Sequence, residues 1–265
     1  MTNHRDIIII GGGLNGASLG LALAKHGVTS HIIDNGNRAD MLAAEFDGRT
    51  TAIASSSMAM FEAIGLGDAL TGQGCPIESI WVSDQLKPGE LAFAPEEGAF
   101  LGHMFENRVL RKALFEAMDA EPNLTLHMPA SVATRHIRPG GVAVTLADGT
   151  ELTGQLLVAA EGRKSPTRDE AGFKLAHWNY GHIALVGAIY HSEPHNGCAY
   201  EIFYPDGPFA LLPMNPDEGA PLPYRSAFVW SVPENKAAAY QKLSDRVFLM
   251  EMQKSMQEMM GDIAL

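Results

Sequence analysis

The chain has 265 residues, 46% of them apolar, and a net charge of −12 at pH 7, so it can bury one large core or two modest ones but lacks the basic surface that nucleic-acid binding requires. No apolar run reaches the roughly 18 residues of a membrane span, so we expect no transmembrane segment and at most a peripheral membrane contact. The two cysteines, Cys75 and Cys198, show no metal or redox spacing, which favours a reducing, cytoplasmic location.

The first part of the chain alternates strand and helix patterns. Residues 6–10 form a β-rich apolar run, residues 15–26 read as a helix of small side chains, and residues 30–34 read as a second strand. These three segments predict a βαβ unit. A further helix is expected at residues 55–66, where apolar side chains recur at helical spacing behind a serine-rich start.

The middle of the chain mixes short strands with one amphipathic helix. Strands are expected at residues 79–83 and 91–93, and apolar side chains from Leu110 to Met118 follow the helical period. Residues 142–154 then read as a hairpin around an Asp-Gly turn. Its returning arm is expected to continue as an apolar strand through residue 160.

Beyond Gly172 the pattern changes to strands with no helix between them. This indicates a separate antiparallel sheet, followed by a helical tail from about residue 235 whose methionines are expected to pack in a core. The strand-like runs are residues 183–191, 199–204, 209–214 and 226–232.

A glycine-rich loop follows the first strand and carries the strongest motif. Gly11, Gly13 and Gly16 satisfy G-x-G-x-x-G between a strand and a helix, an arrangement that lets backbone and a helix N-terminus approach a pyrophosphate. Asp34 lies 18 residues after Gly16, at the end of the second strand, where a carboxylate accepts hydrogen bonds from a ribose diol. A carboxylate would repel a 2′-phosphate, so the motif predicts FAD or NAD as the bound nucleotide.

Several further stretches resemble the para-hydroxybenzoate-hydroxylase-like flavin monooxygenases. "FDGRTTAIASSSMAMFEAIGLGDAL" contains Arg49, and "ENRVLRKALFEA" places Asn107 before leucines three and seven positions later. "LVAAEGRKSPTR" resembles the second flavin motif of that family, with Glu161 and Gly162 at its Asp-Gly position. Within the family, the later strands are similar to those of the ubiquinone-biosynthesis hydroxylases of the 2-polyprenyl-6-methoxyphenol hydroxylase type.

This resemblance implies an α/β fold in which a Rossmann-like FAD-binding domain is joined to an antiparallel β-sheet substrate domain. It implies flavin contacts from Arg49, Asn107, Glu161 and Gly162 in addition to the fingerprint residues. The FAD-binding domain is expected at residues 1–75 and 100–175, and the substrate domain, with its C-terminal helix, at residues 76–99 and 176–265.

The implied activity is hydroxylation of the ring of a polyprenylated phenol in ubiquinone biosynthesis. FAD would be reduced by NAD(P)H, and molecular oxygen would be the co-substrate. The implied partners are the prenylated phenol and, at the periphery of the inner membrane, lipid or other quinone-synthesis proteins. No side chain stands out as a catalytic acid or base. His191 and His195 lack companion ligands, so no metal site is expected.

Two departures from the family pattern keep alternatives open. Glu161 stands where the family has aspartate, and the third flavin motif, a strand followed by Gly-Asp and a glycine-rich helix start, does not occur in the sequence, so the chain is expected to be C-terminally truncated. A non-catalytic fragment, a scaffold of a quinone-synthesis assembly and an NAD-dependent oxidoreductase are the alternatives. Individual residues have structural alternatives too. Asn107 is equally suited to cap its helix, whereas the position of Arg49 favours a role near the flavin or its pyrophosphate over that of a surface cation.

Overall fold

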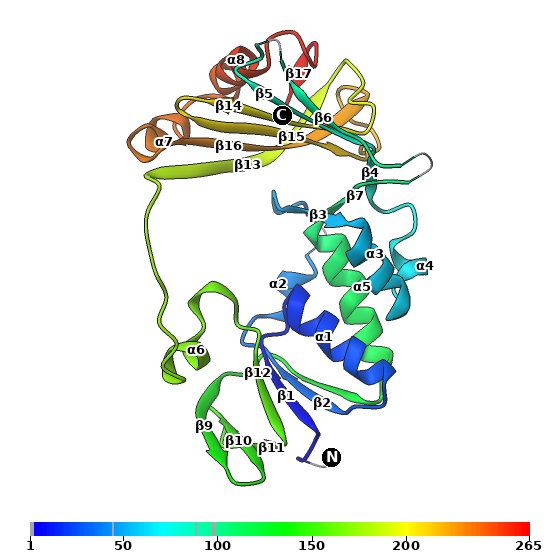
Figure 1. Ribbon diagram of the computed structural model, residues 1–265, viewed down its shortest axis with the longest axis vertical. Coiled ribbons are helices and arrows are strands. Elements are labelled where there is room, and N and C mark those ends of the chain that lie inside the picture. Colours follow the sequence, from blue (N-terminus) through cyan, green and yellow to red (C-terminus); the bar gives the residue numbers. More distant parts are fainter. Residues whose placement is uncertain (1–2, 44, 88, 97–98) are drawn as a thin grey trace. The chain divides into compact units, whose positions relative to one another are not determined.

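The computed structural model describes residues 3–43, 45–87, 89–96 and 99–265 (Figure 1). The chain divides into two compact units. Unit 1 comprises residues 1–45, 60–70 and 108–176, and unit 2 comprises residues 46–59, 71–107 and 177–265. In the described part of the chain, no helix is both long and apolar enough to cross a membrane.

Unit 1 is built on a four-stranded parallel sheet in the order β12-β1-β2-β8. The side chains of the inner strands are buried because both faces of the sheet are covered, as is usual for parallel sheets; Ile8, Ile9 and Ile32 are fully buried. The strands are β1 (Ile7–Ile10), β2 (Ser30–Ile33), β8 (Leu124–His127) and β12 (Leu156–Ala159). The predicted βαβ unit is confirmed.

Helix α1 (Leu14–Lys25) joins β1 to β2 and lies against the sheet (Figure 1). Most of its buried residues are small, among them Gly16, Ala17 and Ala24. At Gly20, a Cβ would lie only 2.7 Å from Cδ1 of Ile32, so a larger residue there would require the Ile32 side chain to move. Helix α5 (Asn107–Ala120) buries the predicted apolar stripe, including Leu110 and Leu114, and ends before Pro122. The expected helix at residues 55–66 is shorter: α3 (Ser55–Ala63) stops before Gly65, whose φ of +91° is incompatible with a continuing right-handed helix.

A three-stranded antiparallel sheet covers one side of the parallel sheet. It consists of β9 (Val132–Arg138), β10 (Gly141–Leu146) and β11 (Glu151–Gly154), and it shares a core cluster with β1 and β2. Strand β9 was not predicted. The expected continuation of the hairpin arm is wrong, because the chain breaks at Gln155 and β12 joins the parallel sheet. Short helices complete unit 1: α2 (Arg38–Met41), α4 (Gly67–Leu70), the 3-10 turn η1 (Gly162–Lys164) and α6 (Pro166–Glu170).

Unit 2 contains a seven-stranded sheet in the order β17-β13-β16-β15-β14-β5-β6 (Figure 1). All neighbouring strands are antiparallel except β14 and β5, which run parallel. The strands are β5 (Ser79–Asp84), β6 (Leu91–Phe93), β13 (His182–His191), β14 (Cys198–Tyr204), β15 (Gly207–Met214), β16 (Tyr224–Pro233) and β17 (Ile263–Ala264). The predicted substrate sheet is thus confirmed, with β5 and β6 added from earlier in the chain.

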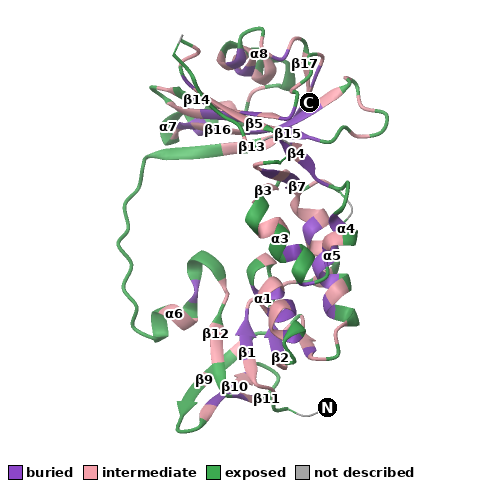
Figure 2. Cartoon of the chain, turned by 45° about the vertical axis from the view of Figure 1, so that its right-hand side comes forward, coloured by how far each residue is buried: buried purple, intermediate pink, exposed green. Residues whose placement is uncertain are grey.

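Two helices cover one face of this sheet. Helices α7 (Glu234–Tyr240) and α8 (Asp245–Met256) replace the single predicted tail helix. Met252 and Met256 are fully buried in a cluster with Phe209 and Trp230, which confirms that the methionine stripe is core packing. The first residues of β13 are exposed, whereas β16 is mostly buried (Figure 2).

A small antiparallel sheet completes unit 2. It consists of β3 (Thr50–Ala54), β7 (Gly102–Glu106) and β4 (Cys75–Ile77), none of which was predicted. Cys75 and Met104 of this sheet share a buried cluster with Met214 and Ala227 of the large sheet. The small sheet therefore packs on part of the face that the helices leave open.

Candidate functional site: a nucleotide-binding cleft

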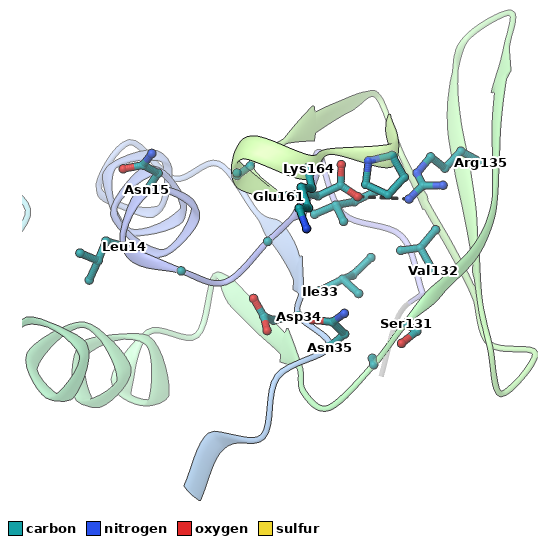
Figure 3. Close-up of a pocket in the computed structure, with 17 residues that line it drawn as sticks. Leu14, Asn15, Ile33, Asp34, Asn35, Ser131, Val132, Arg135, Glu161 and Lys164 are labelled. Atoms are coloured by element: carbon teal, nitrogen blue, oxygen red, sulfur yellow. Dashed lines mark hydrogen bonds and ion pairs between the residues drawn. The ribbon is translucent and has the colours of Figure 1, made fainter. Parts of the chain in front are cut away.

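A cavity of about 660 Å³ opens at the carboxyl ends of β1, β2 and β12 in unit 1. This edge is where open parallel sheets bind ligands. Its lining brings together the glycine loop, the end of β2 and the turn after β12 (Figure 3). Of the predicted site residues, Gly11, Gly13, Asp34, Glu161 and Gly162 line it directly.

The glycine loop leaves room for a ligand where the fingerprint requires it. At Gly11 a Cβ would lie 2.3 Å from the carbonyl oxygen of Ala160, and at Gly16 it would lie 1.8 Å from the carbonyl oxygen of Gly11. These two glycines therefore permit tight packing inside the loop. At Gly13 a Cβ would meet nothing within 4 Å, so the space above it is open toward the cavity.

The N-terminus of α1 faces this open space without a side-chain cap. No side chain accepts from its first N–H groups, and its first turn holds no acidic residue. The unsatisfied N–H groups and the helix dipole suit a negatively charged phosphate.

The Asp34 carboxylate is held in place by backbone. Oδ2 accepts from the Gly12 N–H at 2.7 Å, and Oδ1 accepts from the Gly36 N–H at 2.7 Å. Each carboxylate oxygen has a second lone pair, so Asp34 can still accept from a ribose diol. Its position at the end of β2, beside the cavity, fits the predicted role.

The two carboxylate oxygens of Glu161 accept hydrogen bonds from three donors on neighbouring segments of unit 1. Oε2 accepts from the Ser165 hydroxyl and from the Thr167 N–H, and Oε1 accepts from Nη2 of Arg135 at 3.2 Å (Figure 3). The carboxylate therefore orders the turn between β12 and α6. Gly162 follows at a φ of +79°, which favours glycine over any side-chain-bearing residue.

Arg135 is a cavity residue that the sequence did not indicate. Its side chain, 10% exposed, extends from β9 and pairs with Glu161 and, at 2.9 Å, with Glu170. Its Nε is buried without a hydrogen-bond partner among the described residues. No motif marks this arginine, because β9 itself lacks a clear strand pattern.

A histidine pair lies on two neighbouring strands of the same sheet, with His31 on β2 and His127 on β8. The Nε2 of His127 and the Nδ1 of His31 are 3.0 Å apart, close enough for one ring N–H to donate to the other. Burial lowers the pKa of His31 to about 4, helped by the neighbouring ring, and burial also lowers the pKa of His127. The pair is therefore neutral at pH 7.

The remaining predicted residues, Arg49 and Asn107, belong to unit 2, where they adjoin each other. The Asn107 N–H donates to the Arg49 carbonyl at 3.0 Å, and the Thr51 hydroxyl donates to Oδ1 of Asn107 at 2.6 Å. The amide Nδ2 of Asn107 keeps its donors, with no partner among the described residues. The Arg49 side chain is exposed. Their contacts with a flavin stay a prediction.

The sequence profile described as "FAD binding domain" matches residues 4–262, nearly the whole chain. The chain belongs to the FAD-binding domain family. This membership confirms the expected fold class and favours FAD over NAD as the nucleotide. The cleft agrees with it, because open space above Gly13, a bare helix N-terminus and the Asp34 carboxylate fit the pyrophosphate and ribose of an FAD.

Curated relatives include hydroxylases of quinone synthesis. The chain is 40% identical over 227 residues to ubiquinone hydroxylase UbiL of Rhodospirillum rubrum, covering 85% of this chain and 51% of that protein. It is 30% identical to 3-demethoxyubiquinol 3-hydroxylase of Escherichia coli, covering 81% and 56% of the two chains. The chain thus spans about half the length of these relatives.

A solved structure supports the fold. PqsL, a probable FAD-dependent monooxygenase from Pseudomonas aeruginosa, superposes with a TM-score of 0.75 at 19% identity, over 95% of this chain and 67% of that one. At this identity the likeness concerns the architecture.

Proposed function

We propose that this chain binds FAD and a prenylated phenol as part of a flavin-dependent aromatic hydroxylase of ubiquinone biosynthesis. The observation that carries the proposal is the cleft of unit 1, where the glycine loop, the open N-terminus of α1 and Asp34 converge in a member of the FAD-binding family. The hydroxylase names of the two relatives support the reaction class. Residues 1–75 and 100–175 would serve the flavin, and residues 76–99 and 176–265 the substrate.

Each part of the chain has a defined task in this proposal. The N–H groups around Gly13 would hold the pyrophosphate, Asp34 would accept from the ribose, and the turn at Glu161 and Gly162 would close the cleft. Arg49 and Asn107 would supply further flavin contacts. Bound FAD would supply the redox chemistry, with NAD(P)H as electron donor and oxygen as co-substrate. The protein's contribution is to bind, orient and exclude water.

The substrate sheet of unit 2 would accept the phenol and its apolar tail. Such a tail partitions into membranes, so we propose that the protein collects its substrate at the periphery of the inner membrane or from other quinone-synthesis proteins. The net charge of −12 argues for contact with apolar tails or protein partners over attraction to anionic headgroups.

The test combines a spectrum with a turnover assay. Purified protein should show the visible absorbance of bound flavin, and Asp34→Ala should weaken FAD binding in a titration. NADPH oxidation should then rise on addition of a prenylated phenol, with a hydroxylated product by mass spectrometry. Binding of NAD without FAD would overturn the proposal, and FAD binding without phenol-dependent oxidation would favour the non-catalytic alternatives.

A further inference from the structure

The large sheet of unit 2 has two different faces. On β14, Tyr200, Ile202 and Tyr204 point into the cluster under α7 and α8. Because side chains alternate along a strand, Glu201 and Phe203 lie on the opposite face. Glu201 is half-buried there, and the Phe203 side chain is 51% exposed.

A row of side chains crosses this second face through Glu201. Glu201 is paired with Val82 of β5 on one side and with Ala210 of β15 on the other. Toward both edges of the sheet, every further residue in this row is aliphatic. Glu201 is therefore the sole polar residue of the row. From β6 to β13 the row reads Leu91, Val82, Glu201, Ala210, Val229 and Val186.

The Glu201 carboxylate has no hydrogen bond or ion pair with any described residue. Burial raises its pKa above the ordinary value, and no neighbouring charge contributes to that shift. The other charged groups on this face already have partners: Asp84 of β5 pairs with Lys87, and Arg225 of β16 pairs with Glu106 and Asp217. No ionisable side chain lies on β15 or β6, and Tyr190 of β13 donates to Asp217.

The half-buried Glu201 carboxylate has lost part of its hydration, and a ligand that donates a hydrogen bond to it would compensate that loss. The ligand that matches this row is flat and apolar, since Ala210 and Val82 offer small aliphatic contacts, and it carries one hydroxyl group opposite Glu201. A phenol with an apolar tail has these properties. Exposed Leu91 and Val186 at the ends of the row, 63% and 54% exposed, offer further apolar surface for the tail.

We propose that Glu201 accepts a hydrogen bond from the phenolic hydroxyl of the substrate and thereby fixes the ring on this face. The bond draws the hydroxyl proton toward the carboxylate, which increases the electron density in the ring of the bound phenol. The role rests on the proposed function of the chain. Glu201 is then a substrate-contacting residue that selects phenols over their ethers.

The experiment compares two probes on three forms of the FAD-loaded protein. The probes are 2-farnesylphenol and its methyl ether, which has the same tail and ring but no donor. Equilibrium dialysis should show that the unsubstituted protein binds the phenol about tenfold or more tightly than the ether. Glu201→Gln, which keeps the shape but removes the charge, should weaken phenol binding several-fold, because a neutral amide oxygen accepts a weaker hydrogen bond than a carboxylate.

Asp84→Asn is the matched control, because it removes one carboxylate from the same face two strand positions away and should change neither affinity. In the unsubstituted protein, the preference for the phenol should also vanish in acid, as Glu201 becomes protonated, and should do so at a pH above the ordinary glutamic acid range. Unchanged thermal unfolding of Glu201→Gln would show that its fold is intact.

Two results would overturn the role of Glu201. If Glu201→Gln binds the phenol as well as the unsubstituted protein does, the hydroxyl is recognised elsewhere, and the proposed function still stands. If the FAD-loaded protein binds neither probe, the phenol proposal fails as a whole.

Discussion

Replacing Glu161 with alanine should destabilise unit 1 substantially, because its carboxylate joins three parts of the cleft wall. Oε1 accepts from Arg135 of β9, and Oε2 accepts from Ser165 and from the N–H of Thr167 in α6. The Glu161 and Arg135 side chains are only 13% and 10% exposed. Removal of the carboxylate therefore leaves a nearly buried guanidinium with one remaining partner, Glu170, whose own side chain is 58% exposed.

The magnitude follows from these contacts. A hydrogen bond to a charged group contributes about 1.5–3 kcal/mol, and breaking a fully buried pair by removing one partner costs about 3–5 kcal/mol. Because Glu170 and solvent partly compensate Arg135, we expect a loss of about 2–4 kcal/mol. Glu151→Ala is the matched control: its partner Arg138 is 3.4 Å away and both side chains are more than half exposed, so the loss should stay below about 1 kcal/mol.

The assay is urea unfolding of Glu161→Ala, Arg135→Met and the double variant, followed by circular dichroism. The double-mutant cycle should give a coupling energy of about 1–3 kcal/mol. The free energy of unfolding of Glu161→Asp should lie between those of the unsubstituted protein and Glu161→Ala, because a side chain shorter by one bond of about 1.5 Å cannot reach all three donors. A loss below 1 kcal/mol for Glu161→Ala, or additive effects in the cycle, would refute the reasoning.

Three further outcomes are expected. Gly13→Ala should leave the free energy of unfolding unchanged but weaken FAD binding at least tenfold, whereas Gly16→Ala should lower both, as unfolding curves and FAD titrations will show. The free energy of unfolding should fall by about 1–3 kcal/mol as the pH drops from about 6.5 toward 4, because in this range His31 is protonated in the unfolded chain but stays neutral in the folded protein. His31→Asn should reduce this pH dependence, as measured by urea unfolding at several pH values. Arg225→Met should destabilise unit 2 by about 2–4 kcal/mol, since it removes the nearly buried cation that pairs with Glu106 and Asp217, and Glu106→Gln in the same chain should recover part of the loss in thermal unfolding.

Local patterns were enough to predict the βαβ unit and its loop. A run of four isoleucines, a helix of small residues and three spaced glycines are all features of short segments, so Gly11, Gly13 and Asp34 could be placed at one cleft. The later strands could also be predicted from the sequence, because Pro, Gly and Asn separate their apolar runs. The resemblance to the flavin monooxygenases then added Glu161 and Gly162, which the structure brings to the same cavity.

Contacts between distant segments could not be predicted. The pairing of β14 with β5 joins residues more than a hundred positions apart, and the small sheet of unit 2 has strands too short to show a period. Arg135 was missed for the same reason, since its importance arises only where β9 meets the turn at Glu161. The bond from Thr51 to Asn107 is likewise a tertiary contact, invisible as a helix-capping pattern.

The pairing of β1 with β12 has a consequence for how the protein is made. Residues 7–10 meet β2 early, but their other neighbour begins at Leu156, so one edge of the central strand stays open while the intervening chain is produced. At 5–20 residues per second this interval lasts roughly 7–30 s. One edge of strand β5 likewise stays unpaired until β14 has been synthesised. The unpaired edges of two strands with apolar side chains are therefore exposed during synthesis, so we expect the nascent chain to need chaperones and the yield of folded protein to depend on the speed of translation.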